Sequence, residues 1–147
     1  MHPKIQMSEA ERDEFLTARK TARVGSISPD GYPHNVPVGY WWRDERLYFP
    51  SDEAAQKVAN CRRDGRVCVV VDEGTAGDDY DTLAGVMMQG DATVYDETGH
   101  DRVTHQALME HLFDGGPVAD QERYDRVDRV VVEVEPHNIV TWDFSKV

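Results

Sequence analysis

Residues 47–71 constrain the fold of this chain more than any other stretch, because they read as a strand, a short helix and a second strand in close succession. Leu47 to Phe49 are strand formers, and Val67 to Val71 have the composition of a buried strand. Between them, Glu53 to Arg62 predicts a helix that ends before the turn dipeptide Asp64-Gly65. A helix that starts where a strand ends places free backbone N–H groups at a sheet edge.

The start of this helix is a candidate anion site. We expect Pro50 to end the strand and Ser51 or Asp52 to cap the helix. The free N–H groups and the helix dipole favour a phosphate there. Lys57, one of only four lysines, lies within reach of the first turn and is a candidate phosphate ligand. The alternative is a lysine on a solvated helix face.

The charge of the chain excludes some partners. It carries 28 acidic and 16 basic residues, a net charge of −12, and the acidic residues are spread along the chain. Nucleic acid and anionic membrane surfaces need a basic footprint, so neither is an expected partner. A dispersed acidic surface fits a halophilic protein, because salt screens its self-repulsion. An ordinary acidic bacterial protein is the alternative.

Length and cysteine content predict a single cytoplasmic domain over residues 1–147. No apolar run approaches the roughly 20 residues that a membrane helix needs, and the first residues do not resemble a signal peptide. Cys61 and Cys68 fit neither a redox nor a zinc pattern, so we expect two small buried side chains in a reducing compartment.

The other segments predict mostly strands joined by turns. A capping box at Ser8 and Glu11 opens a first helix. The segments expected to be strands are Ala22 to Ser28, His34 to Trp42, Ala84 to Tyr95, Val130 to Val134 and Asn138 to Phe144, and those expected to be helices are Thr98 to Phe113 and Ala119 to Arg126. Residues 22–49 then form a three-strand meander, Pro37 marks an edge or a bulge, and Gly90 marks a bulge or a close approach of the backbone. This order favours a small antiparallel barrel over a parallel sheet.

No catalytic motif stands out. His100, His105 and His111 are spaced by five and six residues and do not share one helix face, so no metal site is expected. The chain has no GxGxxG, Walker or nucleophile-elbow pattern. Aromatic residues are dense around residues 40–49 and at 142–144, and together with the phosphate site they suggest a phosphorylated, planar, aromatic ligand.

Five segments in this order resemble the FMN-binding split β-barrel family of pyridoxamine 5′-phosphate oxidase: RVGSISPDGYPHNVPVGYW, LYFPS, QKVANCRRDGRVCVVVD, GVMMQGDATVY and VEVEPHNIVTWDFSK. The resemblance covers roughly residues 15–146. It implies a mainly β fold with helices in the connections, namely a six-stranded antiparallel split β-barrel of Greek-key type. It also implies a homodimer with two cofactor sites at the subunit interface.

The resemblance also implies which residues bind FMN. The phosphate maps onto Pro50, Ser51 and Lys57, with Gln56 beside the lysine, and the ring maps onto the second and third strands. The partner subunit is expected to add residues from the later strands. The ring contacts implied are Val36, Val38, Tyr40, Tyr48 and Phe49 from one subunit, and Met88, Gln89 and Trp142 from the other.

Two departures from the family argue against vitamin B6 oxidation. True pyridoxamine phosphate oxidases have a basic residue where this chain has Gln56. Near the C-terminus, where they bind the substrate phosphate, only Lys146 is basic. The same barrel serves enzymes that use the deazaflavin coenzyme F-420, which resemble this chain in length and in RRDGRV, and some relatives bind haem.

Three functions follow from these patterns. The first is an oxidoreductase in which FMN or the deazaflavin carries hydride to or from a small organic substrate; Tyr40 is a hypothetical proton donor. The second is a non-catalytic flavin or haem carrier, storage protein or sensor. The third is a structural barrel with an empty groove.

Overall fold

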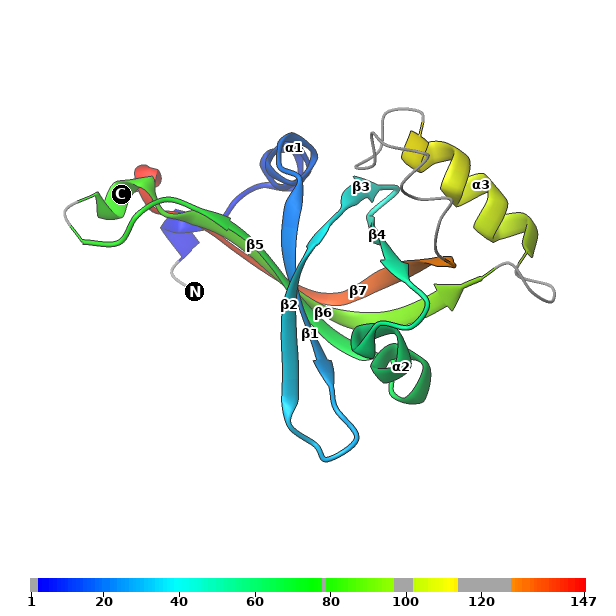
Figure 1. Ribbon diagram of the computed structural model, residues 1–147. Helices are drawn as coiled ribbons and strands as arrows, with labels where there is room; N and C mark the ends of the chain where they lie inside the picture. Colours follow the sequence, from blue (N-terminus) through cyan, green and yellow to red (C-terminus); the bar gives the residue numbers. More distant parts are fainter. Residues whose placement is uncertain (1–2, 78, 97–101, 114–127) are drawn as a thin grey trace.

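The computed structural model describes residues 3–77, 79–96, 102–113 and 128–147, and its described strands form one antiparallel sheet that curls into a half-barrel (Figure 1). The strands are β1 (Thr21–Ile27), β2 (Pro33–Gly39), β3 (Trp41–Arg43), β4 (Arg46–Asp52), β5 (Arg66–Glu73), β6 (Ala84–Tyr95) and β7 (Arg129–Asp143). Their order in the sheet is β2-β1-β5-β6-β7-β4-β3.

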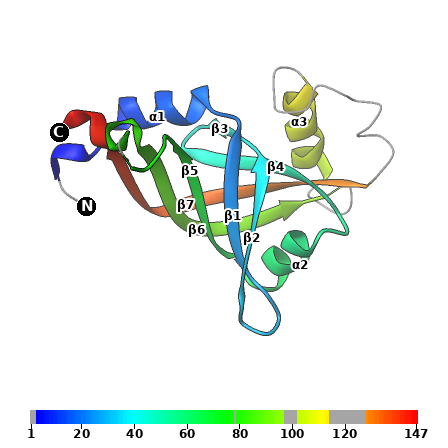
Figure 2. The same cartoon turned by 60° about the vertical axis from the view of Figure 1, so that its left-hand side comes forward.

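Helices lie in the connections: α1 (Glu9–Ala18), α2 (Gln56–Arg63) and α3 (Arg102–Phe113), with the short 3-10 turns η1 (Pro3–Ile5), η2 (Tyr80–Thr82) and η4 (Phe144–Lys146). Figures 1 and 2 show both termini at one end of the sheet and α2 and α3 toward the other. None of the helices described is long and apolar enough to cross a bilayer.

The mainly β fold is confirmed, but the sheet has seven strands and not six. The expected strand from His34 to Trp42 is split at Tyr40, whose buried hydroxyl donates a hydrogen bond to Leu16 O at 2.5 Å. The meander over residues 22–49 is therefore wrong: β2 lies at one edge of the sheet and β3 at the other. Pro37 lies on edge strand β2, as predicted.

The two expected closing strands are one continuous strand, β7, because its pairing with β6 continues through Pro136. Gln89 pairs with Asn138 and Gly90 with Pro136, so His137 is the extra residue of a β-bulge. The bulge predicted at Gly90 is confirmed, and it lets β7 absorb a proline without ending.

Helix α2 begins later than predicted. Strand β4 continues through Pro50 to Asp52, on a stretch that β3 no longer pairs, which is where a strand tolerates a proline. Ser51 and Asp52 are thus strand residues, not helix caps. The Asp52 carboxylate instead accepts the Ala54 N–H at 2.9 Å and shapes the turn, and Ala55 is the N-cap with no capping side chain.

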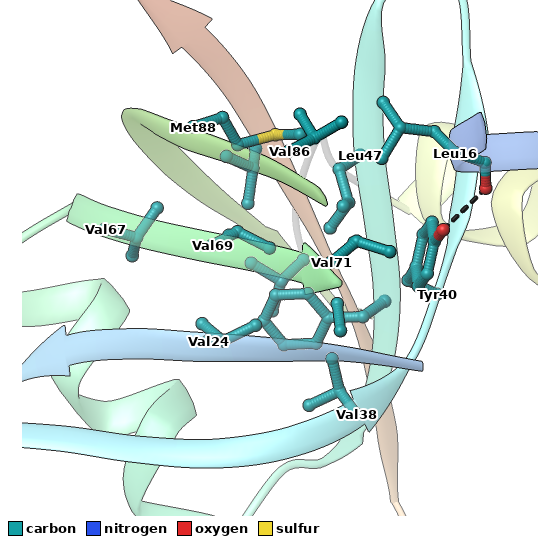
Figure 3. Packing of buried hydrophobic residues seen from close by; sticks show 14 of the residues in the cluster. Leu16, Val24, Val38, Tyr40, Leu47, Val67, Val69, Val71, Val86 and Met88 are labelled. Atoms are coloured by element: carbon teal, nitrogen blue, oxygen red, sulfur yellow. Dashed lines mark hydrogen bonds between the residues drawn. The ribbon is translucent and has the colours of Figure 1, made fainter. Parts of the chain in front are cut away.

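The core fills the concave side of the sheet (Figure 3), where alternate residues of β1, β5, β6 and β7 point inward. A second cluster lies on the opposite side under α3, where Trp41 and Tyr48 stack at 5.2 Å between ring centroids and contact Leu108 and Val131. Cys61 is buried in the main core as expected, whereas Cys68 faces outward and is half-buried. Each strand therefore contributes to two different surfaces.

The N-terminal helix is held at the end of the sheet where the chain ends meet. The capping box of Ser8 and Glu11 is confirmed in both directions. Lys146 donates to Glu11 Oε1 at 2.8 Å and to Gln6 O at 3.1 Å. With the Ser8 hydrogen bonds, this lowers the pKa of Glu11 to about 2, Lys146 being the largest cause.

Candidate functional site

The first turn of α2 gathers positive charge. Lys57 is half-buried, and burial first, then the charge of Arg129, lowers its pKa, while Asp52 and Cys61 act in the opposite direction. Arg129 opens β7 and is paired in register with Asp52 at the end of β4. We call this group, Ser51, Asp52, Ala55, Lys57 and Arg129, the α2 corner.

The α2 corner fits an anionic group. The N-cap Ala55 leaves the first-turn N–H groups of α2 without a capping side chain. A free helix N-terminus attracts an anion. An anion placed between two cations that repel each other is also stabilised by both. The residues present therefore suit a phosphate.

A polar chain adjoins the corner on the side of β1 and β2. Gln56 donates to Asn60 Oδ1 at 2.8 Å, and the fully buried Asn60 donates to Ser26 Oγ at 3.0 Å. His34 is the cross-strand partner of Ser26, and its Nδ1 is buried with no hydrogen-bond partner among the described atoms. A buried nitrogen in this state suits a polar ligand atom.

Several residues implied as ring contacts lie in the core. Val38, Tyr40 and Phe49 are buried there, and Phe49 is fully enclosed. Tyr40 holds α1 through Leu16 O, and burial raises the pKa of its hydroxyl, which gives it a structural role. Val36 is half-buried on the same side of β2 as Val38, toward the interior.

Tyr48 points the opposite way from Phe49, into the cluster under α3. Burial, followed by the nearby Glu133 carboxylate, raises the pKa of Tyr48 to about 12. Pro50 is half-buried, and Ser51 is buried with its hydroxyl donating to Asp52 O at 3.1 Å. Of the residues proposed for the phosphate, Lys57 is thus the one with a charged group at the corner.

The convex side of the sheet carries the residues expected at a subunit interface, with one shift. Met88 is fully buried in the core, and its neighbour Met87 points outward. Val70, Met87 and Val140 pair side by side across β5, β6 and β7, and Trp142 lies one step along β7. These four half-buried side chains form a surface that we call the outer patch.

The indole of Trp142 covers Gly85, where an added Cβ would overlap the ring, lying 2.7 Å from Cε2 and closer still to Cζ2. Gln89 is exposed on the next row, facing outward, beside a groove of about 610 Å³. We call this hollow the bulge groove; its lining includes Ile27, Pro33, Cys68, Gln89 and His137.

Asp91 and His137 form an ion pair at the rim of the bulge groove, and the hydrogen bond to Asp91 raises the pKa of His137. The pair stabilises the fold fully at a pH below the ordinary His pKa of about 6.5. This stabilisation is lost as the pH rises through the raised pKa of His137 in the folded protein. We expect wild type to have a higher urea midpoint than His137→Gln at pH 5, and the gap to close in alkaline buffer. A gap that widens with pH would contradict this assignment.

Metal ligation finds no support among the residues described, where no group of three candidate ligands occurs. His100 and the side chain of His111 lie outside that set, as do Thr98 and the helix expected over residues 119–126. His105 is buried, and its Nε2 lies 3.0 Å from Arg129 O, so it helps place the start of β7.

A second hollow, of about 530 Å³, lies beside α1 and holds several carboxylates, among them Glu14, Asp81 and Asp143. Lys146, the basic residue near the C-terminus, is bonded to Glu11 at this end of the molecule. It therefore lies at the opposite end from α2 (Figure 1).

Comparison with known proteins identifies the fold class. The family model described as pyridoxamine 5′-phosphate oxidase matches residues 8–143. The chain therefore belongs to the pyridoxamine 5′-phosphate oxidase family, with the split-barrel fold. A conserved hypothetical protein of Mycobacterium tuberculosis is 30% identical, with a TM-score of 0.79 over 99% of this chain and 91% of that one.

A curated relative, a 5a,11a-dehydrotetracycline/5a,11a-dehydrooxytetracycline reductase of Streptomyces rimosus, is 26% identical over 87% of this chain and 78% of its own length. An FAD-binding protein of Mesorhizobium loti is 22% identical, with a TM-score of 0.69 over 92% of this chain and 94% of that one. An F-420 reductase and a haem storage protein of Vibrio cholerae share the fold at 23% and 16% identity.

Three features of the site were missed in the sequence. Arg129 is far from Lys57 along the chain, and only strand pairing between β4 and β7 brings them together. His34 was expected only as a strand residue. Met88 was expected to face a partner subunit, whereas its side chain lies in the core and Met87 faces outward. The alternation of β6 could have separated the two methionines, since residues two apart share a face.

Proposed function

We propose that this protein is an oxidoreductase that binds a flavin-type cofactor with its phosphate at the α2 corner. The pairing of Lys57 with Arg129 at an uncapped helix start supports this most directly. The bound cofactor would supply the hydride chemistry. Lys57, Arg129 and the first-turn N–H groups of α2 bind the phosphate, while His34 offers its buried nitrogen to a polar atom of the tail.

FMN is our first choice of cofactor, and the deazaflavin coenzyme F-420 is the alternative, since both carry a phosphate. The solved FAD-binding protein and F-420 reductase of the same fold support this range. The reductase relative supports reduction of a small organic substrate. Vitamin B6 oxidation is not favoured, because Lys146 is bonded to Glu11 and Gln56 is neutral.

The active form that we propose is a homodimer that packs through the outer patch. Val70, Met87, Val140 and Trp142 form a continuous apolar surface on a chain that is otherwise strongly acidic. Partly exposed apolar patches of this kind mark interfaces. Partner residues on this side, Gln89 and Trp142 among them, would then close over the cofactor.

Removing the lysine tests the proposal. Lys57→Ala is expected to weaken FMN binding about ten- to hundredfold, because a charge-assisted contact contributes roughly 1.5–3 kcal/mol. Calorimetric titration with FMN, and with F-420 in parallel, measures the dissociation constants. Lys20→Ala is the matched control, since it removes the same charge from a residue before β1, away from the α2 corner. An equal loss in both variants, or no loss in either, would remove Lys57 from the site.

A turnover assay distinguishes the proposed oxidoreductase from the non-catalytic alternative. A carrier or haem-storage protein is expected to retain its ligand without reducing any acceptor, and a haem protein shows a Soret band after purification. A protein that binds none of the three cofactors would leave only the structural barrel.

A further inference from the structure

His105 joins helix α3 to the first residue of strand β7. It is buried, with 4% of the residue exposed, and its Nε2 lies 3.0 Å from Arg129 O. A carbonyl oxygen can only accept a hydrogen bond, so Nε2 carries the hydrogen and donates it. A buried side chain of α3 therefore holds a backbone group at the point where the chain enters β7 (Figure 1).

The Arg129 carbonyl points away from β4. The Glu53 N–H donates to Asp128 O at 3.0 Å, which makes these two residues a hydrogen-bonded pair of the β4–β7 ladder. Such pairs alternate in an antiparallel ladder, so the next pair, Asp52 with Arg129, directs its backbone groups away from the opposite strand. On that outer side β6 pairs with β7 only from Val131 onward in the described part of the chain. His105 therefore supplies a donor where the pairing with β6 has ended.

The position of the Arg129 backbone decides where its guanidinium can reach. Residues opposite each other in a ladder have side chains on the same face, so Arg129 shares a face with Asp52 at the α2 corner. Its charge is close enough to Lys57 to add to the effect of burial and lower the pKa of that amine. A shift of the first residue of β7 would move the guanidinium relative to Lys57 and to the first-turn N–H groups of α2.

We propose that His105 is a positioning residue of the cofactor site: its hydrogen bond to the Arg129 carbonyl holds the guanidinium where it binds the cofactor phosphate. This inference rests on the proposed function, because it requires a phosphate at the α2 corner. The rival role is purely structural. His105 would then only help α3 to pack, as Leu108 does in the cluster with Trp41 and Tyr48.

Two replacements of His105 separate these roles. His105→Leu fills the space without a donor, whereas His105→Gln keeps an N–H group at a reach similar to that of Nε2. Each variant is titrated calorimetrically with FMN and with F-420, and the cofactor that wild type binds more tightly is compared. His105→Leu is expected to weaken its binding about five- to tenfold, and His105→Gln less than about twofold. Unchanged binding by His105→Leu, or an equal loss in His105→Gln, overturns the positioning role.

A double-mutant cycle shows whether the effect passes through the guanidinium. Arg129→Gln is expected to weaken cofactor binding about ten- to hundredfold. In that background His105→Leu is expected to cause no further loss, because the group that it positions has been removed. Additive losses would overturn the positioning role alone. An Arg129→Gln variant that binds as tightly as wild type would refute the phosphate site of the proposed function, and the positioning role with it.

Leu108→Val is the control for the stability of α3. It trims the cluster under α3 and keeps the His105 hydrogen bond, so it is expected to lower the urea midpoint and leave cofactor affinity unchanged. An affinity loss equal to that of His105→Leu would assign the effect to the packing of α3 and overturn the proposal. Circular dichroism checks folding. Should His105→Leu fail to fold, His105→Asn takes its place with the same expected loss, because its shorter side chain cannot reach the Arg129 carbonyl.

Discussion

Gly90→Ala is expected to destabilise the fold by about 3 kcal/mol, the upper end of the usual cost of overpacking. An added Cβ would lie 2.8 Å from the carbonyl carbon of Glu135 and 2.9 Å from Pro136 Cα, both backbone atoms of β7. Backbone in the middle of a sheet cannot rotate away as a side chain can. Urea denaturation followed by circular dichroism gives the change in unfolding free energy.

Gly31→Ala separates steric overlap from backbone conformation. Gly31 has φ +87° in the β1–β2 turn, but a Cβ added there would have no neighbour within 4 Å. Its replacement is expected to cost about 1 kcal/mol, from the positive φ alone. If Gly90→Ala were no more costly than this, the close approach of β6 and β7 at the bulge would be refuted.

Val140→Glu is expected to raise the dissociation constant of the proposed homodimer about a hundredfold or more. Val140 is in the middle of the outer patch, paired in register with Met87. A carboxylate buried there without a partner costs roughly 3 kcal/mol, which corresponds to about two orders of magnitude in the dissociation constant. Sedimentation equilibrium measures the monomer fraction of wild type and variant.

Thr93→Glu is the control for the added charge. Thr93 is on β6 outside the outer patch, and its replacement is expected to leave the oligomeric state unchanged. A wild-type protein that is monomeric at all concentrations tested would sink the dimer proposal. A dimer that survives Val140→Glu would move the interface to another surface.

Local patterns predicted much of the fold. The bounds of β6, the capping box of α1, the bulge at Gly90 and the edge position of Pro37 follow from residue type and spacing, and the structure confirms each. These features depend on neighbours in sequence, and the physical preferences that set them act over a few residues.

The errors arose where distant segments decide. Tyr40 breaks a run of strand formers because its hydroxyl bonds to Leu16 O of α1. Pro50 stays within β4 because β3 is too short to pair with it. The start of α2 differs for a local reason, because the Asp52 carboxylate accepts the Ala54 N–H two residues on and does not cap the helix.

The candidate site was predicted only in part for the same reason. Lys57 could be selected from its position in a helix, but its partner Arg129 is brought to it by the pairing of β4 with β7. The ring contacts implied for Phe49 and Met88 point to buried side chains. The family resemblance predicted where the strands lie, but it did not predict on which face of the sheet each side chain lies.

The edge strand β2 has a consequence for how this chain associates. Pro33 and Pro37 give it two positions without an N–H group, so a foreign strand cannot extend the sheet by adding along this side. Strand β3, at the far side, is only three residues long. Both edge strands therefore disfavour edge-to-edge aggregation of copies of this chain. Contact between copies is left to the two faces of the sheet.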